Sequence, residues 1–351
     1  MEHERGIKVI LLVVLCLFSA VWFNAGTANS ADKVVLKIAH SDAMDIYTSR
    51  KHAQQVAFQR IVNAESGGRI EVQVFGAGSV GGEREIVESV TAGNLQATSA
   101  SGVLGGFYPP AMVTDIPYLF PSAAVAWDVL DGPFGKKLSE GLIKKTGLRN
   151  LTFGEVGFRH FTNNKRQIRT PEDMKGLKIR VQETPLYITL VKALGGNPTP
   201  VPWPETYSAL QSGVVEGQEN PVSVIIFAKL YEVQKHITLD GHVYGVDWLM
   251  VNEKFFQSLS PDLQYILLDA AKISSGVSRG IQQLNSAVGL AKLAEAGVQI
   301  YAPTEKEREL FKVACQKPVI DWLKTKVDPG LIDEALKAVE SVSKRHKSEL
   351  K

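Results

Sequence analysis

The segment Val34-Val35-Leu36-Lys37-Ile38-Ala39 is a short apolar run that predicts a buried strand, and a regular alternation follows it. Residues 50–64 place apolar side chains at helical spacing, residues 70–74 alternate as a second strand, and residues 83–92 have a helical pattern. A third, short strand is expected over residues 97–101. This order of elements predicts the beginning of an α/β sheet.

The same alternation returns in the middle of the chain. Strand patterns cover residues 151–156, 158–162 and 177–181, and helical patterns cover residues 186–194 and 205–211. Two α/β units are the simplest interpretation of this repetition.

A long helical pattern indicates how the two units are joined. From residue 261 to residue 296, apolar side chains recur every three or four positions without an internal proline. Such a helix would be roughly 50 Å long, which exceeds the diameter of one small domain. We therefore expect it to extend across both units. The alternative is two helices that are broken at Gly276 or Gly280.

Composition excludes several classes of protein. The chain has 351 residues, of which 44% are apolar and 22% are charged, so it is neither disordered nor collagen-like. A formal charge of +2 gives no field that would attract nucleic acid or an anionic membrane. The two cysteines, Cys16 and Cys315, are too few for a structural zinc site or a disulfide framework. Recognition by charge must therefore be local, inside a pocket.

The N-terminus predicts export. Residues 9–23 form an apolar run that is shorter than the roughly 20 residues of a membrane span and suits a signal-peptide core. Small residues at 28–31 offer cleavage sites, so we expect residues 1–31 to be a signal peptide and the mature protein to be free in the periplasm or outside the cell. An uncleaved anchor is the alternative.

One glycine-rich motif has two interpretations. Residues 76–81 (GAGSVG) match the dinucleotide-binding pattern GxGxxG, after a predicted strand and before a predicted helix. However, no acidic residue occurs between Glu88 and Asp115, where a ribose-binding carboxylate is expected. We therefore interpret the glycines as a tight turn that brings Glu83 toward a cleft. Because zinc-binding and phosphate-binding motifs are also absent from the sequence, no cofactor or metal is predicted.

Two arginines and one asparagine lie where open α/β sheets bind ligands. Strand-forming residues flank Arg159 and Arg180, and Asn220 ends an apparent turn before a helix. A guanidinium can donate two parallel hydrogen bonds to a carboxylate, so either arginine suits an anionic ligand. The alternatives are a core carboxylate as partner for each arginine and a helix cap for Asn220.

Several strings of the chain have the order and spacing of one known family. They are residues 158–164 (FRHFTNN), 168–181 (IRTPEDMKGLKIRV), 194–200 (LGGNPTP) and 207–221 (YSALQSGVVEGQENP). The chain is thereby similar to the DctP-type solute-binding proteins of tripartite ATP-independent periplasmic (TRAP) transporters, and the similarity covers essentially the whole mature chain.

The resemblance implies a two-lobed periplasmic binding protein fold, an α/β Venus flytrap of type II-like architecture, with the long helix spanning both lobes. Lobe I would comprise residues 32–156 and about 246–285. Lobe II would comprise residues 157–245 and about 286–351.

The resemblance also implies that the protein closes on a small organic anion, without chemistry, and delivers it to the membrane permease subunits of a TRAP transporter. Arg180 would form the main salt bridge to the ligand's carboxylate, with help from Arg159 and Asn220. Trp203 would pack over the ligand.

Further contacts are implied from elsewhere in the cleft. They are Glu83, Ser101 and His40 from lobe I, and Glu183 as an acceptor of ligand hydroxyls, unless it is a solvent-facing carboxylate. Ala100 stands where sialic-acid-binding members carry an acidic residue, which makes sialic acid a poorer candidate. Dicarboxylates, sugar acids, keto acids, aromatic acids and sulfonates all remain open. We expect a monomer that has no nucleic-acid partner.

Two other functions use the same cleft. An exported enzyme could use Glu83 or His40 as a base on a small acid. A sensory protein could report the bound ligand to a receptor.

Overall fold

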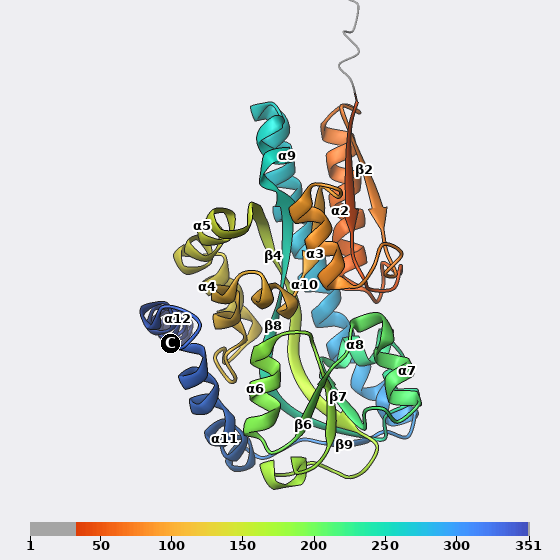
Figure 1. Cartoon of the computed structure of the whole chain (residues 1–351), viewed down its shortest axis with the longest axis vertical. Helices are drawn as coiled ribbons and strands as arrows, with labels where there is room; N and C mark the ends of the chain where they lie inside the picture. Colours follow the sequence, from red (N-terminus) through yellow and green to blue (C-terminus); the bar gives the residue numbers. More distant parts are fainter. Residues whose placement is uncertain (1–32, 350–351) are drawn as a thin grey trace, which may run out of the picture. The chain divides into compact units, whose positions relative to one another are not determined.

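The computed structural model describes residues 33–349 and forms a mixed α/β fold around one sheet (Figure 1). The sheet order is β2-β1-β3-β8-β4-β7-β5-β6, and β9 pairs with β8. The strands of the described chain are β1 (Val34–Ala39), β2 (Ile70–Phe75), β3 (Ala97–Ala100), β4 (Leu148–Asn163), β5 (Lys178–Val181), β6 (Asn197–Pro200), β7 (Gly217–Asn220), β8 (His236–Asn252) and β9 (Gln299–Tyr301). The predicted α/β class is confirmed. The predicted signal peptide lies outside the described residues.

The described part of the chain also contains eleven α-helices and five 3-10 helices. The α-helices are α2 (Arg50–Glu65), α3 (Glu83–Ala92), α4 (Ala123–Leu130), α5 (Pro133–Thr146), α6 (Pro185–Ala193), α7 (Thr206–Gln211), α8 (Val222–Phe227), α9 (Glu253–Ser258), α10 (Pro261–Glu295), α11 (Glu305–Leu323) and α12 (Pro329–Glu349). The 3-10 helices are η1 (Gly102–Gly106), η2 (Pro109–Asp115), η3 (Pro171–Met174), η4 (Trp203–Glu205) and η5 (Leu230–Glu232). Within residues 33–349, no helix has the length and apolarity of a membrane span.

The long strands β4 and β8 pair antiparallel along most of their length and connect the two ends of the sheet. The prediction of separate strands at 151–156 and 158–162 is wrong, because β4 continues through both. A register shift between Glu155 and Gly157 bends the pairing instead. Gly157 has a φ of +97°, and a Cβ there would lie 2.5 Å from Gln282 Nε2, so the position requires glycine.

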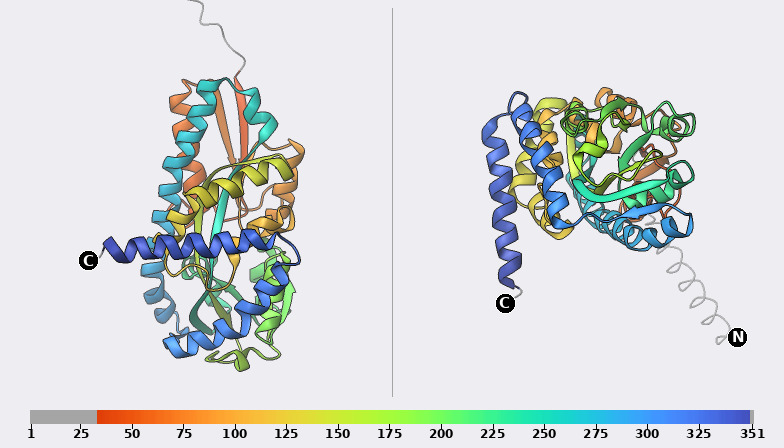
Figure 2. Two further views of the ribbon diagram at one scale, coloured as in Figure 1. Left: turned by 90° about the vertical axis from the view of Figure 1, so that its left-hand side faces the viewer. Right: turned by 90° about the horizontal axis from the view of Figure 1, so that it is seen from below.

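Helix α10 is continuous over 35 residues, so the expectation of one long helix is confirmed and the alternative of a break is wrong. Gly276 and Gly280 lie inside the helix and face open space. The helix contacts α2 and β4, and it also contacts α8. At Gly289 an added Cβ would lie 2.7 Å from Val222 of α8, so α10 approaches α8 closely there. One helix therefore contacts elements of both α/β units. Figure 2 shows α10, in light blue, running beside the orange helix α2.

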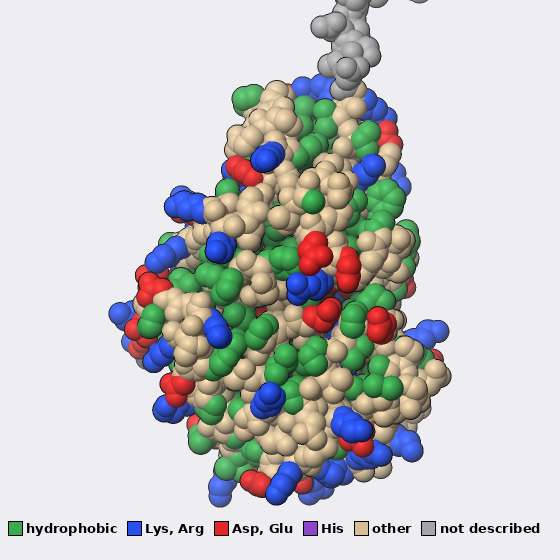
Figure 3. Space-filling model, viewed as in Figure 1, with side chains coloured by type: hydrophobic (Ala, Val, Ile, Leu, Met, Phe, Trp, Pro, Cys, Tyr) green, Lys and Arg blue, Asp and Glu red, His purple; other side chains and the backbone are tan. Residues whose placement is uncertain are grey.

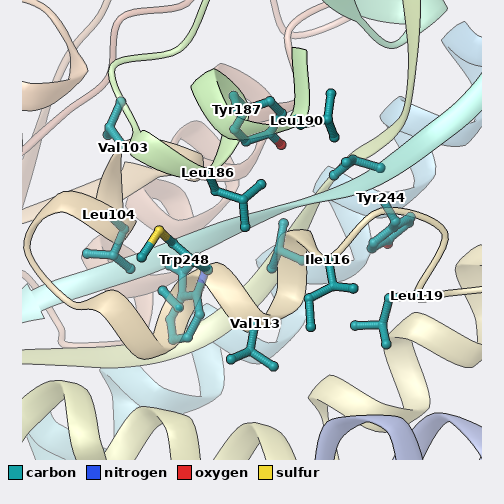
Figure 4. Close-up of a cluster of buried hydrophobic side chains, with 14 of the residues drawn as sticks. Val103, Leu104, Val113, Ile116, Leu119, Leu186, Tyr187, Leu190, Tyr244 and Trp248 are labelled. Atoms are coloured by element: carbon teal, nitrogen blue, oxygen red, sulfur yellow. The ribbon is translucent and has the colours of Figure 1, made fainter. Parts of the chain in front are cut away.

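The main apolar core joins the two predicted units. Leu186, Tyr187 and Leu190 of α6 lie in one cluster with Ile116, which follows η2, and Trp248 of β8 (Figure 4). These side chains are buried. Burial of large apolar and aromatic side chains is the main stabilising contribution to such a fold. The core thus holds in place the strand ends at which polar residues gather.

Candidate functional site

One pocket lies where β3, β5 and β7 end and where α2 and α3 begin. Its space, including the mouth open to solvent, measures about 450 Å³. It is lined by Asp42, Arg50, Lys51, Glu83, Ser101, Val103, Val156, Arg159, Arg180, Gln182, Glu183, Trp203, Asn220, Val224 and Phe227. Figure 3 shows acidic and basic side chains close together near the centre of the face that carries α3. The pocket therefore combines several charged groups with an apolar wall.

The structure brings together all of the predicted site residues except His40. Arg180, Arg159, Asn220, Trp203, Glu83, Ser101 and Glu183 line the pocket. His40 lies after β1 and is buried with its Nε2 3.0 Å from Nδ1 of His52. Burial, together with the neighbouring His52, lowers the pKa of His40 to about 3. Its ring is not among the side chains that line the pocket.

Within residues 33–349, Arg180 is a buried cation without an ion-pair partner. Its Nε and Nη2 both donate to the carbonyl oxygen of Val201, at 2.9 and 2.7 Å, and its guanidinium carbon lies 5.6 Å from the Trp203 ring centre. The residue is 2% exposed. Among residues 33–349, no carboxylate oxygen lies within 4 Å of its nitrogens. Burial lowers the pKa of Arg180 to about 10. A buried charge of this kind is costly until an anion balances it.

Arg159 has the same exposure but a different environment. It is on β4, and its Nη2 donates to Glu219 Oε1 at 2.8 Å and to the Glu219 carbonyl oxygen at 2.6 Å. Glu219 Oε2 also lies 3.3 Å from His242 Nε2, and His242 Nδ1 lies 2.9 Å from Asp240. Burial alone would lower the pKa of His242, but Asp240 and Glu219 raise it to about 9. Arg159 therefore lines the pocket as part of a buried charge network, which is the core pairing that the sequence left open.

A second group of charges lies where α2 and α3 begin. Arg50 Nε is 2.8 Å from Asp247 on β8, and Arg50 Nη1 is 3.2 Å from Asp42. Lys51 Nζ is 3.3 Å from Glu83 and 3.4 Å from Asp247. All five side chains are buried. Two cations thus meet three carboxylates on this side of the pocket.

Sequence reasoning missed Asp42, Arg50, Lys51 and Gln182 as pocket residues. One signal was available for two of them, because Arg50 and Lys51 are the first residues of α2. The positive end of the helix dipole disfavours basic side chains at that place. Two consecutive cations there indicate nearby anions, but the sequence does not show which ones.

The glycine turn positions Glu83 as the first residue of α3, as expected. The Glu83 carboxylate accepts hydrogen bonds from the Ser101 backbone N–H and, at 3.0 Å, from the Ser101 hydroxyl. The Ser101 hydroxyl also lies 3.2 Å from Gln182 Oε1, just after β5. Ser101 therefore connects the α3 side of the pocket to the β5 side.

Asn220 and Trp203 complete the β7 side. Asn220 is the last residue of β7 and not part of a turn, and its Nδ2 donates to Gln218 Oε1 at 2.6 Å. Trp203 begins η4, so the helix predicted from residue 205 is preceded by a 3-10 turn. Its ring contacts Phe227 edge to face, with centres 6.0 Å apart. Trp203 and Phe227 thus form an apolar wall beside Arg180.

Glu183 lines the mouth of the pocket and is partly buried. Burial, together with the neighbouring Glu85, raises its pKa. The described residues contain no group of three His, Cys, Asp or Glu side chains arranged to hold a metal ion. The arrangement as a whole suits binding of an anion that also carries polar groups.

Comparisons with known proteins agree with this geometry. Residues 46–325 match the model of the family described as bacterial extracellular solute-binding protein, family 7 (DctP). A solute-binding protein from Verminephrobacter eiseniae is 40% identical over 77% of this chain and 82% of its own.

Two solved structures are similar over most of the chain. The sugar acid binding protein DctPAm from Advenella mimigardefordensis, in complex with galactonate, has a TM-score of 0.84 and 32% identity, over 88% of this chain and 99% of its own. A TRAP periplasmic solute-binding protein from Polaromonas, bound to D-erythronate, has a TM-score of 0.81 and 33% identity, over 88% and 98% of the two chains.

The family settles the broad class of function. Its members are periplasmic, substrate-binding components of transporters and not enzymes, so the exported-enzyme alternative is wrong. Its members bind small organic acids and work with TRAP membrane components. On its sequence, its fold and this family match, the chain belongs to the DctP family of bacterial extracellular solute-binding proteins, the binding components of TRAP transporters.

Proposed function

We propose that this protein captures a small organic acid anion by forming an ion pair between Arg180 and the ligand's carboxylate. The observation that carries the proposal is the state of Arg180, which is 2% exposed, lines the pocket and has no carboxylate partner within the described residues. A buried, unbalanced guanidinium gains more from an incoming anion than one that is already paired.

The walls of the pocket support this assignment. Both contacts of Arg180 with Val201 hold the guanidinium plane in place and leave its remaining N–H groups for a ligand. Trp203 and Phe227 also line the pocket and add apolar surface beside the guanidinium. In such an environment an ion pair is stronger than in water, provided that the remaining polar atoms are satisfied. Asn220 also lines the pocket and would supply a further donor.

The positions of the pocket residues in the chain support closure of two lobes on the ligand. Glu83 and Ser101 belong to the predicted lobe I, and Arg180 and Gln182 belong to the predicted lobe II. The bend of β4 at Gly157 coincides with the predicted boundary between residues 156 and 157. A ligand that contacts both lobes favours the closed state only through contacts available after closure.

The proposed cargo and destination come from the relatives. The two similar structures hold galactonate and D-erythronate, so we assign an organic acid of this kind to this protein. We further propose that residues 1–31 direct it to the periplasm and that it delivers its cargo, as a monomer, to the permease subunits of a TRAP transporter. Reporting to a sensor would use the same closed state.

A binding assay with matched variants tests the Arg180 assignment. The protein without residues 1–31 is refolded to remove carried ligand and screened by thermal shift against organic acids, because a ligand of the native state raises the melting temperature. Any acid that binds should lose more than about 1000-fold in affinity in Arg180→Ala, through loss of a buried charged pair. Arg149→Ala is the control, since Arg149 pairs with Glu253 and does not line the pocket. Unchanged affinity in Arg180→Ala would contradict the proposal.

A further inference from the structure

The cations that line the pocket are not equally available to a ligand. Arg50 is paired with Asp42 and Asp247, and Lys51 is paired with Glu83 and Asp247. The third cation, Arg159, is paired with Glu219. Of the basic side chains that line the pocket, only Arg180 lacks a carboxylate within 4 Å among the described residues. The pocket therefore offers one unbalanced positive charge.

The side of the pocket formed by α2 and α3 has the opposite character. Its two cations, Arg50 and Lys51, meet the three carboxylates of Asp42, Glu83 and Asp247, which leaves an excess of one negative charge. Asp42 and Glu83 themselves line the pocket. Glu183 adds a further carboxylate to the lining. A second carboxylate on the ligand would thus meet like charge on this side.

On the side of the pocket formed by α2 and α3, hydrogen-bond donors and acceptors lie close to one another. Lys51 Nζ lies 3.3 Å from Glu83 Oε1, and Glu83 Oε1 also lies 3.0 Å from the Ser101 hydroxyl. A ligand group placed here contacts donors and acceptors together. A hydroxyl both donates and accepts, so it satisfies both kinds of partner. An ammonium group only donates and would be repelled by Lys51, and a methylene group would leave the buried polar atoms without a ligand partner.

We propose that the ligand is a polyhydroxylated monocarboxylate, whose carboxylate pairs with Arg180 and whose hydroxyls contact Lys51, Glu83 and Ser101, and that the excess negative charge around Asp42 and Glu83 rejects dicarboxylates. This inference rests on the function proposed above and narrows it to one class of acid. It makes Glu83 a residue that determines specificity, through its charge and through hydrogen bonding.

Three acids that share a six-carbon chain test the inference by calorimetry. Galactonate has one carboxylate and five hydroxyl-bearing carbons, galactarate replaces its terminal alcohol with a second carboxylate, and hexanoate lacks all hydroxyls; erythronate and gluconate extend the first class. With the refolded protein at pH 7, the tightest-binding aldonate should bind at least 100-fold more tightly than galactarate and hexanoate. In Glu83→Gln, the ratio between that aldonate and galactarate should fall at least tenfold. Glu88→Gln, which alters an exposed carboxylate of α3 outside the pocket lining, should leave the ratio unchanged.

Failure of this inference differs from failure of the proposed function. If galactarate binds as tightly as the aldonates, rejection of dicarboxylates is wrong. If hexanoate binds as tightly as the aldonates, the proposed recognition of hydroxyls is wrong. If no aldonate binds, the assigned class is wrong. In each of these cases the proposed function survives when the acid that does bind, galactarate, hexanoate or another anion of the screen, loses its affinity in Arg180→Ala.

Discussion

Two arginines that line the same pocket, both 2% exposed, differ in what balances their charge. Arg159 on β4 is held by the Glu219 side chain and backbone, with His242 and Asp240 behind it. Arg180 on β5 has only the Val201 carbonyl oxygen as its hydrogen-bond partner in the described chain. The strand between them, β7, carries Glu219 toward one arginine and not the other. The number of cations around a pocket is therefore not the number available to a ligand.

The largest expected difference between the two arginines is in stability. Arg159→Ala leaves Glu219 buried with only His242 as a charged partner and should lower the free energy of unfolding by about 4 kcal/mol. Arg180→Ala removes a buried charge that no carboxylate of residues 33–349 balances, and it should change the free energy of unfolding by less than about 1.5 kcal/mol. Urea unfolding of the ligand-free proteins measures both. Equal losses in the two variants would break the distinction between a structural and a ligand-binding arginine.

His242 should give the Arg159 network a pH dependence between pH 6.5 and pH 9. Its pKa is raised to about 9 in the folded protein, against about 6.5 for a free imidazole. A raised pKa adds stability that is fully present below pH 6.5 and is lost as the pH rises through 9, which amounts to about 3 kcal/mol.

Comparing the wild type with His242→Gln isolates this contribution. The difference in unfolding free energy between the two proteins should shrink as the pH rises from 7 to 9.5. A difference that stays constant over this range would show that His242 is neutral in the folded protein.

A smaller loss of folding stability is expected for the charges where α2 and α3 begin. Asp247→Asn keeps a hydrogen-bonding side chain but removes the negative charge shared by Arg50 and Lys51, and should cost about 2 kcal/mol. The pair of Asp131 with Arg279 provides the control, because the Asp131 side chain is half exposed and Asp131→Asn should cost less than about 1 kcal/mol. Equal costs in the two variants would mean that these cations do not depend on Asp247, and the charge balance of the pocket would need revision.

Strongly periodic segments were predictable from the sequence. The helices at residues 83–92 and 261–295 and the strand at residues 34–39 lie almost where their patterns place them, because their apolar spacing leaves one way to bury a face. The continuity of β4 through Gly157 was not predictable, because a glycine at a β-bulge has the sequence pattern of a turn between two strands.

The candidate site was predictable only in part, because its charge balance depends on long-range contacts. Arg50 and Asp247 are 197 positions apart, and Arg159 and Glu219 are 60 apart. No local pattern links such pairs. The family resemblance predicted that Arg180 and Trp203 lie at the pocket, and both line it. Only the fold shows that Glu219 forms an ion pair with Arg159 and not with Arg180.

The central claim is that Arg180 is the cation that awaits the ligand's carboxylate. A crystal structure of the refolded protein with the acid that binds most tightly tests it most directly. The account predicts a carboxylate oxygen within about 3 Å of the Arg180 guanidinium nitrogens, with the Arg159–Glu219 pair intact. A carboxylate that instead contacts Arg50 or Lys51, while Arg180 keeps only its contact with Val201, would contradict it.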